Sequence, residues 1–120
     1  MRHRITGTKF NIDKDHRKML LRNLLTSLIV HGEITTTEAK AKALKSIFDK
    51  FVTRVKTADL AARRYAVQTL LTKEAYEKTF TEVLPRLETR KSGYTNIIRH
   101  DKPRVGDNAK YLTVKIVEKS

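Results

Sequence analysis

Basic side chains are the residues of this sequence whose type and spacing favour binding chemistry. They concentrate in an opening segment, at the start of the first apolar-periodic segment, and around a late loop. The guanidinium fork of Arg matches phosphate oxygens in paired hydrogen bonds, and Lys supplies a point charge. The three groups are Arg2, Arg4 and Lys9; Lys14, Arg17, Lys18 and Arg22; and Arg86, Arg90, Lys91, Arg99, Lys102, Arg104 and Lys110. Residues 1–12 hold no acid, so their charge is not offset locally and indicates phosphate binding.

Histidines and carboxylates form no catalytic or metal-binding pattern in the sequence. No nucleophile elbow, zinc-protease signature or glycine-rich phosphate loop occurs. Asp101 and Asp107 flank a short loop in which Gly106, Asp107 and Asn108 are typical turn residues. The histidines are far apart, at His3, His16, His31 and His100. We therefore expect no enzymatic activity, no metal, no cofactor and no small-molecule substrate.

The charge balance of the chain is strongly positive. Its 120 residues suit one domain, and 26 Lys and Arg face 13 Asp and Glu, which gives a net charge of +13. This charge favours a nucleic acid or an anionic membrane as partner. There is no Cys, and no apolar run approaches the roughly 18–20 residues of a membrane span, so we expect a cytoplasmic protein without one. Aromatic residues are too few for a stacking platform of many rings.

The first half of the chain predicts an arm, two helices and a strand between them. Residues 1–12 have no apolar period, which indicates an extended basic arm ahead of a domain over 13–120. Leucines recur at helical spacing over 14–31, with Asp13 as the N-cap and Gly32 as the end. Thr35 and Glu38 have capping-box spacing, so a second helix should begin near Thr36 or Thr37. A short β-favouring stretch over 33–36 must pair with strands later in the chain.

The second half predicts two more helices and a hairpin. A helix over 60–71 should turn Leu60, Val67, Leu70 and Leu71 inward. A helix over 73–84, capped by Thr72, should end at Pro85 and bury Tyr76, Phe80, Val83 and Leu84. Strands are expected over 94–99 and 111–117, because apolar residues alternate in the second of them. The long loop between these strands favours a functional role, and the whole pattern favours a two-layer α+β fold.

Several motifs, in order along nearly the whole chain, make the sequence similar to one family. The opening "MRHR", the segment "HRKMLLRNLLTSLIVHGEITTTEAKAKAL", and the later "KSGYTNI" and "RVGDNA" resemble the bacterial large-subunit ribosomal protein L17 family. The family motifs fall on Arg2-His3-Arg4, His16-Arg17, Arg22-Asn23, Thr36-Thr37, Ala39-Lys40-Ala41, Gly93-Tyr94-Thr95, Arg104, Gly106-Asp107 and Ala109.

The resemblance implies a fold and a role. The fold would be an α+β two-layer sandwich with about four helices on a small three-stranded mixed sheet, preceded by the extended basic arm. The role would be that of a structural, non-enzymatic constituent of the bacterial large ribosomal subunit in the cytoplasm. The chain would bind and bridge large-subunit (23S) ribosomal RNA near the peptide exit region, beside neighbouring ribosomal proteins and without forming a homo-oligomer.

Charge and resemblance together give a set of expected RNA-binding residues. They are Arg2, His3, Arg4, Lys9, Lys14, His16, Arg17, Lys18, Arg22, Arg90, Lys91, Gly93, Tyr94, Arg99, Lys102 and Arg104. The alternative is a free DNA-binding or nucleoid-type basic protein, for which the same charges would serve. That alternative needs a recognition helix or a dimer with regular half-site spacing, and the sequence indicates neither. An RNA-processing enzyme would need a general acid and base within one motif, which is lacking.

Overall fold

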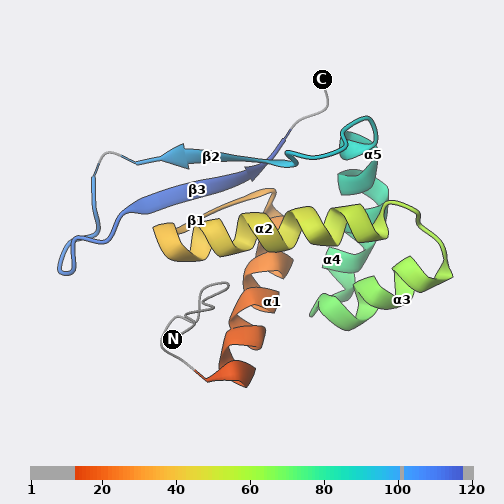
Figure 1. Ribbon diagram of the computed structural model, residues 1–120, viewed down its shortest axis with the longest axis horizontal. Coiled ribbons are helices and arrows are strands. Elements are labelled where there is room, and N and C mark those ends of the chain that lie inside the picture. Colours follow the sequence, from red (N-terminus) through yellow and green to blue (C-terminus); the bar gives the residue numbers. More distant parts are fainter. Residues whose placement is uncertain (1–12, 101, 118–120) are drawn as a thin grey trace, which may run out of the picture.

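The computed structural model describes residues 13–100 and 102–117, which form six helical segments and three strands (Figure 1). The predicted arm over 1–12, with Arg2, His3, Arg4 and Lys9, lies outside the described residues. The elements in chain order are α1 (Lys14–His31), β1 (Glu33–Thr37), α2 (Glu38–Val55), α3 (Leu60–Thr69), α4 (Lys73–Lys78), the π-helical η1 (Thr79–Val83), α5 (Leu84–Leu87), β2 (Thr95–Arg99) and β3 (Tyr111–Ile116).

The three strands form one sheet in the order β1-β3-β2. Both pairings are antiparallel, with Thr113 of β3 opposite Thr35 on one side and Ile98 on the other. The α+β fold is confirmed, but the mixed sheet implied by the resemblance is wrong. The strands β1 and β2 do run in the same direction, yet β3 lies between them, so no parallel ladder forms.

The helices lie on one side of the sheet and enclose the core (Figure 1). The central helix α2 buries Leu44, Phe48 and Phe51, and β3 contributes Val114 and Ile116 to the same apolar cluster. Successive residues of a strand point to opposite faces, so Tyr111 and Thr113 lie on the face away from these core residues. The predicted half-buried strand is therefore confirmed, and it is the middle strand of the sheet.

The ends of the first helix follow from local chemistry, as predicted. The Asp13 carboxylate accepts a hydrogen bond from the backbone N–H of His16 at 2.8 Å. At the other end Gly32 adopts a φ of 82°, and its N–H donates to the Leu28 carbonyl at 2.8 Å. The expected capping box of α2 does not form. Thr35 belongs to β1, and its hydroxyl pairs with that of Thr113 at 2.9 Å, which leaves Thr37 as the N-cap.

The inward face predicted for the third helix is wrong. Leu60 and Val67 of α3 are 65% and 61% exposed, whereas Ala62 and Ala66 are buried. Alanines bring one backbone close to another, so this short helix packs against α2 through Ala62 and Ala66 and turns Leu60 and Val67 outward. The ring of Tyr65 also packs there, with its centre 6.0 Å from that of Phe51 in α2. Only Leu70, just past the helix, is buried as predicted.

The fourth predicted helix continues past its expected end. It begins after Thr72 as predicted, but a π-helical turn and α5 carry it to Leu87. In that turn the N–H of Leu84 donates to the Thr79 carbonyl, five residues back. Pro85 then stands at the start of α5, directly after the π-helical turn, and does not stop the helix.

Candidate nucleic-acid interface

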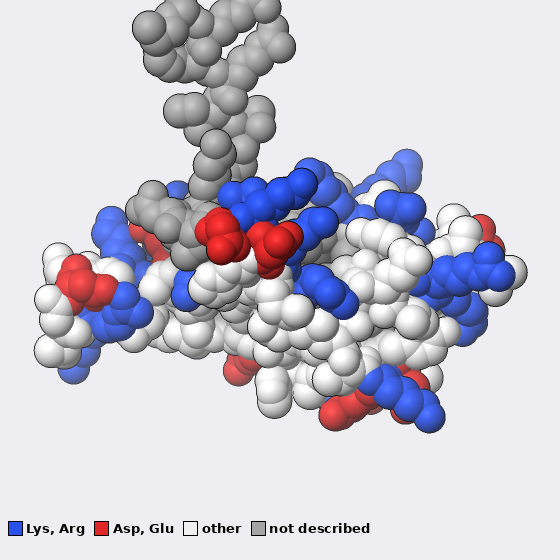
Figure 2. Space-filling view, turned by 90° about the horizontal axis from the view of Figure 1, so that it is seen from below, with Lys and Arg blue, Asp and Glu red and all other residues white. Residues whose placement is uncertain are grey.

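The expected binding residues that the structure describes lie in three places. Lys14, His16, Arg17 and Lys18 occupy the first turns of α1. A second group precedes β2, and a third occupies the end of β2 and the loop that follows. Figure 2 shows Lys and Arg side chains spread along the length of one face of the molecule, with acidic side chains between some of them. Cationic surface is therefore distributed over several elements and is not confined to one patch.

The start of α1 offers cations that have no partner within the described chain. Lys14, His16 and Lys18 are exposed, and Arg17 is partly exposed. Within residues 13–100 and 102–117 the side chains of Lys14, Arg17 and Lys18 take part in none of the three ion pairs. The rigid helix holds them at successive turns, which suits contacts to phosphates along an RNA strand.

Arg22 has a structural partner inside the protein. Its guanidinium donates from Nε to the Thr69 carbonyl at 3.0 Å and from Nη2 to the Gln68 carbonyl at 2.9 Å. These carbonyls belong to the last turn of α3, where a helix has unpaired acceptors and a partial negative charge. The structure thus uses Arg22 to cap α3, whereas the sequence led us to expect a phosphate contact.

Tyr94 is a core side chain in the structure, whereas the sequence led us to expect an RNA contact at this residue. It is 1% exposed, and its hydroxyl donates to the Lys91 carbonyl at 2.9 Å. The Lys56 ammonium lies 4.8 Å from the centre of its ring and also donates to the Arg90 carbonyl. Gly93 allows the preceding turn through a positive φ of 66°. The glycine and tyrosine of this motif therefore shape the turn that leads into β2, and leave the exposed Lys91 at its surface.

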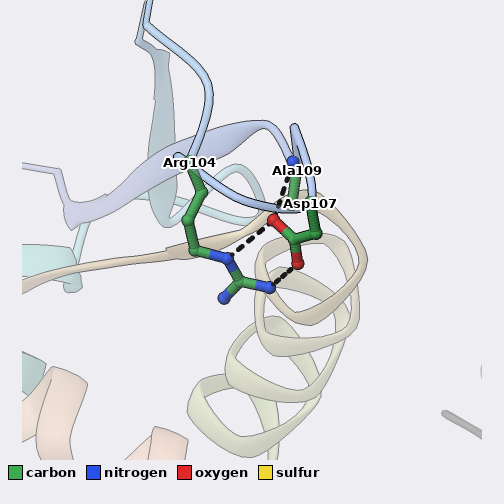
Figure 3. A network of polar contacts seen from close by, with 3 residues as sticks. All are labelled: Arg104, Asp107 and Ala109. Atoms are coloured by element: carbon green, nitrogen blue, oxygen red, sulfur yellow. Dashed lines mark hydrogen bonds and ion pairs between the residues drawn. The ribbon is translucent and has the colours of Figure 1, made fainter.

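Arg104 forms an ion pair within its own loop (Figure 3). Both nitrogens at the fork of its guanidinium, Nε and Nη2, donate to the Asp107 carboxylate, which also accepts the Ala109 N–H at 3.1 Å. The hydrogen bond from Arg104 lowers the pKa of Asp107 from 3.8 to about 2. The charge of Arg104 is thus partly neutralised, so its main effect within the chain is to fix the loop.

Arg99 and Lys110 are exposed cations of the hairpin that enter none of the ion pairs found among the described residues. The hairpin meets the start of α2 where the Glu38 N–H donates to the Lys110 carbonyl at 3.0 Å. Both cations help to lower the pKa of Glu38, after the larger effect of Lys42. Lys42 itself pairs with Glu38 at 3.0 Å. Lys110 and Lys42 were missing from the expected set. Lys42 gives no sequence signal beyond its place off the apolar stripe, whereas Lys110 belongs to the basic group noted around the loop.

Other site chemistries find no support in the part of the chain that is described. Over residues 13–100 and 102–117 no group of three or more His, Cys, Asp or Glu side chains could hold a metal ion. None of the helices there is long and apolar enough to cross a bilayer.

Comparison with known proteins identifies close relatives along nearly the whole chain. A family model described as Ribosomal protein L17 matches residues 20–117. A protein of Hydrogenobaculum sp. is 40% identical over 118 residues, which is 98% of this chain and 100% of the relative. Proteins of Rubrobacter xylanophilus (43% identical; 98% of this chain, 96% of the relative) and Syntrophotalea carbinolica (39%; 98% and 76%) are similar too. All three relatives are described as large ribosomal subunit protein bL17.

The cap that Arg22 provides can be tested by substitution. Arg22→Ala removes two charge-assisted hydrogen bonds to the end of α3, so we expect a loss of about 1–3 kcal/mol in the free energy of unfolding. Urea unfolding followed by circular dichroism measures it. Lys18→Ala, on the same helix but exposed, is the control and should change stability by less than about 0.5 kcal/mol. Equal stability of the two variants would contradict the structural role of Arg22.

The Arg104–Asp107 pair predicts a shifted titration. A carboxylate with a lowered pKa stabilises the folded state above its ordinary value of 3.8, and this contribution is lost as the pH falls through about 2. Carbon-detected NMR of the Asp107 carboxyl should show a midpoint near 2, and Arg104→Gln should move it up towards 3.8. Lys102→Gln, which removes a charge from the same loop, should leave the midpoint in place. An ordinary midpoint in the unsubstituted chain would show that the pair does not form in solution.

Proposed function

This chain belongs to the ribosomal protein L17 family, and from that premise we propose that it is a structural protein of the bacterial large ribosomal subunit. The observation that carries the proposal is the match over 98% of the chain to relatives described as large ribosomal subunit proteins. We further propose that it binds and bridges large-subunit ribosomal RNA and works in the cytoplasm without catalysing a reaction. The family resemblance alone is our reason for placing that RNA near the peptide exit region.

The charge of the chain supports an RNA partner. A surplus of 13 positive charges disfavours the compact state unless anions lie nearby, and RNA phosphates supply them. The described ion pairs are few and local, joining residues three or four positions apart. Most exposed cations therefore remain available for a partner.

Bridging is the mechanism that we propose for this surface. The cations at the start of α1 and those around the end of β2 belong to segments far apart in sequence. The sheet joins these segments, because β1 follows α1 directly and pairs with β3. Two RNA segments bound at these places would be held at a fixed separation. Recognition would depend on the positions of phosphates and on RNA shape, with little reading of bases.

The basic arm over 1–12 is proposed as a further RNA-binding element. Its composition buries too little apolar surface to order the arm alone, and RNA contacts would supply the missing free energy. Neighbouring large-subunit proteins are the expected protein partners, and we propose no homo-oligomer.

Binding to protein-free large-subunit ribosomal RNA tests the proposed function. With roughly six to ten phosphate contacts, the affinity should fall about a thousandfold or more between 50 and 200 mM salt. Filter binding at several salt concentrations measures this slope. Duplex DNA with the same number of phosphates, added as a competitor, distinguishes RNA binding from the DNA-binding alternative. Equal or tighter binding to the DNA would favour that alternative, and an affinity for RNA that ignores salt would contradict phosphate bridging.

Deleting residues 1–9 tests the role of the arm. The truncated chain should bind the same RNA more weakly and with a shallower salt slope, because Arg2, Arg4 and Lys9 are lost. Its thermal unfolding should stay cooperative, since residues between Leu25 and Val117 form a contiguous apolar core. The full chain carrying Arg2→Gln and Arg4→Gln separates loss of charge from loss of length. Loss of cooperative unfolding in the truncated chain would show that the arm belongs to the core.

A further inference from the structure

The hairpin of β2 and β3 opens into a hollow where its loop begins. The last hydrogen bond between the strands joins the His100 N–H to the Tyr111 carbonyl at 3.2 Å. The next hydrogen bond across the hairpin lies closer to the tip of the loop, where the Arg104 N–H donates to the Ala109 carbonyl at 2.8 Å. Between them lies a hollow of about 420 Å³ lined by Arg99, His100, Pro103, Asn108, Lys110, Tyr111 and Leu112. Asp101 lies outside the described residues.

Both ends of this hollow are fixed by interactions of the protein itself. At the outer end, the Arg104–Asp107 pair and the Asn108 N–H, which donates to the Arg104 carbonyl at 3.0 Å, hold the turn closed. At the inner end, the His100 ring shares a hydrogen bond with the Thr113 hydroxyl. A ligand would therefore meet a formed site and would not have to order the loop.

The lining combines positive charge with an aromatic side chain. Arg99 and Lys110 are exposed and enter none of the ion pairs found among the described residues, and none of the described residues that line the hollow is an acid. Glu38, whose pKa both of them help to lower, already has Lys42 as a partner. Tyr111 is half-buried, and the Arg104 guanidinium lies 6.0 Å from the centre of its ring. A ligand with an anionic group and a planar ring meets both features.

The volume of the hollow limits the size of that ligand. A hollow of about 420 Å³ lies in the range of small-ligand sites, roughly 300–1,000 Å³, and is too small for a base-paired helix. Unpaired RNA bases stack on aromatic and Arg planes in proteins that recognise RNA. The scarcity of aromatic residues in this chain excludes a row of stacked bases but not a single one.

We propose that this hollow binds one unpaired nucleotide of the RNA, with its base against Tyr111 and its phosphate at Arg99 and Lys110. The inference rests on the proposed RNA-binding function and adds a local specificity to it. Double-stranded RNA would contact only the cations at the surface of the hairpin, whereas a bulged or looped nucleotide would enter the hollow. The hairpin would thereby select one place on the RNA, which phosphate contacts alone cannot do.

Substitution of Tyr111 tests the site in the full chain bound to protein-free large-subunit ribosomal RNA. Tyr111→Leu should weaken binding by about 5-fold to about 150-fold, as expected for one lost stacked base, without changing the salt slope. Tyr111→Phe keeps the ring and should bind as the unsubstituted chain does. Chemical probing should show one unpaired nucleotide that the unsubstituted chain and Tyr111→Phe protect and that Tyr111→Leu exposes.

Arg99→Gln and Lys110→Gln provide a second test that does not alter the partly buried ring. Each should reduce the slope of log affinity against log salt concentration by about one, and each should expose the same nucleotide. Lys50→Gln, which removes an exposed charge of α2 outside both the lining and the expected binding set, should leave that nucleotide protected. Circular dichroism of every variant separates unfolding from loss of contact.

The outcomes separate the site from the function on which it rests. If the unsubstituted chain binds the RNA but Tyr111→Leu binds equally well and no nucleotide changes its reactivity, the nucleotide site is wrong and the proposed function stands. If the hollow instead holds an acidic segment of a neighbouring protein, protection will not change with bare RNA, which equally overturns the site. If the unsubstituted chain does not bind the RNA, the proposed function fails first.

Discussion

Packing of α2 against one face of the three-stranded sheet is the constraint on which the rest of the structure depends. Phe48, Phe51 and Val52 of α2 are buried in one apolar cluster with Val114 and Ile116 of β3. The middle strand β3 comes last in the chain and pairs with both β1 and β2. The sheet therefore forms only when β3, late in the chain, pairs with β1, which lies in its first third. That pairing sets the cationic start of α1 and the hairpin at fixed positions in one body.

Cations inside the described chain often bind backbone carbonyls, because acids are scarce. The Lys78 ammonium donates to the Val30 carbonyl at 2.8 Å, near the end of α1, and Arg22 caps the end of α3. Lys56 donates to the Arg90 carbonyl beside Tyr94. The last carbonyls of a helix carry a partial negative charge, so such contacts stabilise the helix without a carboxylate. A strongly basic chain thus holds itself together with part of its positive charge and leaves the remainder at the surface.

The hairpin loop contains both kinds of positive charge: one that binds within the protein and one that stays at the surface. Arg104 and Asp107 close the outer turn, while Arg99 and Lys110 remain without ion pairs among the described residues. The two kinds of cation lie within a few residues of each other. Among the described residues, what separates them is that Arg104 has a carboxylate of its own loop as an ion-pair partner. Asp107 stands three residues from Arg104 and is held towards it by the Ala109 N–H.

Features that depend on local chemistry could be predicted from the residues alone. The bounds of α1, its caps at Asp13 and Gly32, the strand β3 and the α+β class follow from residue types and apolar spacing. Only the tertiary structure decided which face of α3 is buried, because Ala62 and Ala66 fit against α2 more closely than Leu60 and Val67 would. The folded chain also showed that Arg22 and Tyr94 have partners inside the protein, unlike the exposed cations. Those partners lie on another element or another turn, so the sequence did not reveal them. A sequence shows which residues carry a charge or a ring. Which group each of them contacts depends on how the chain folds, because folding brings distant segments together.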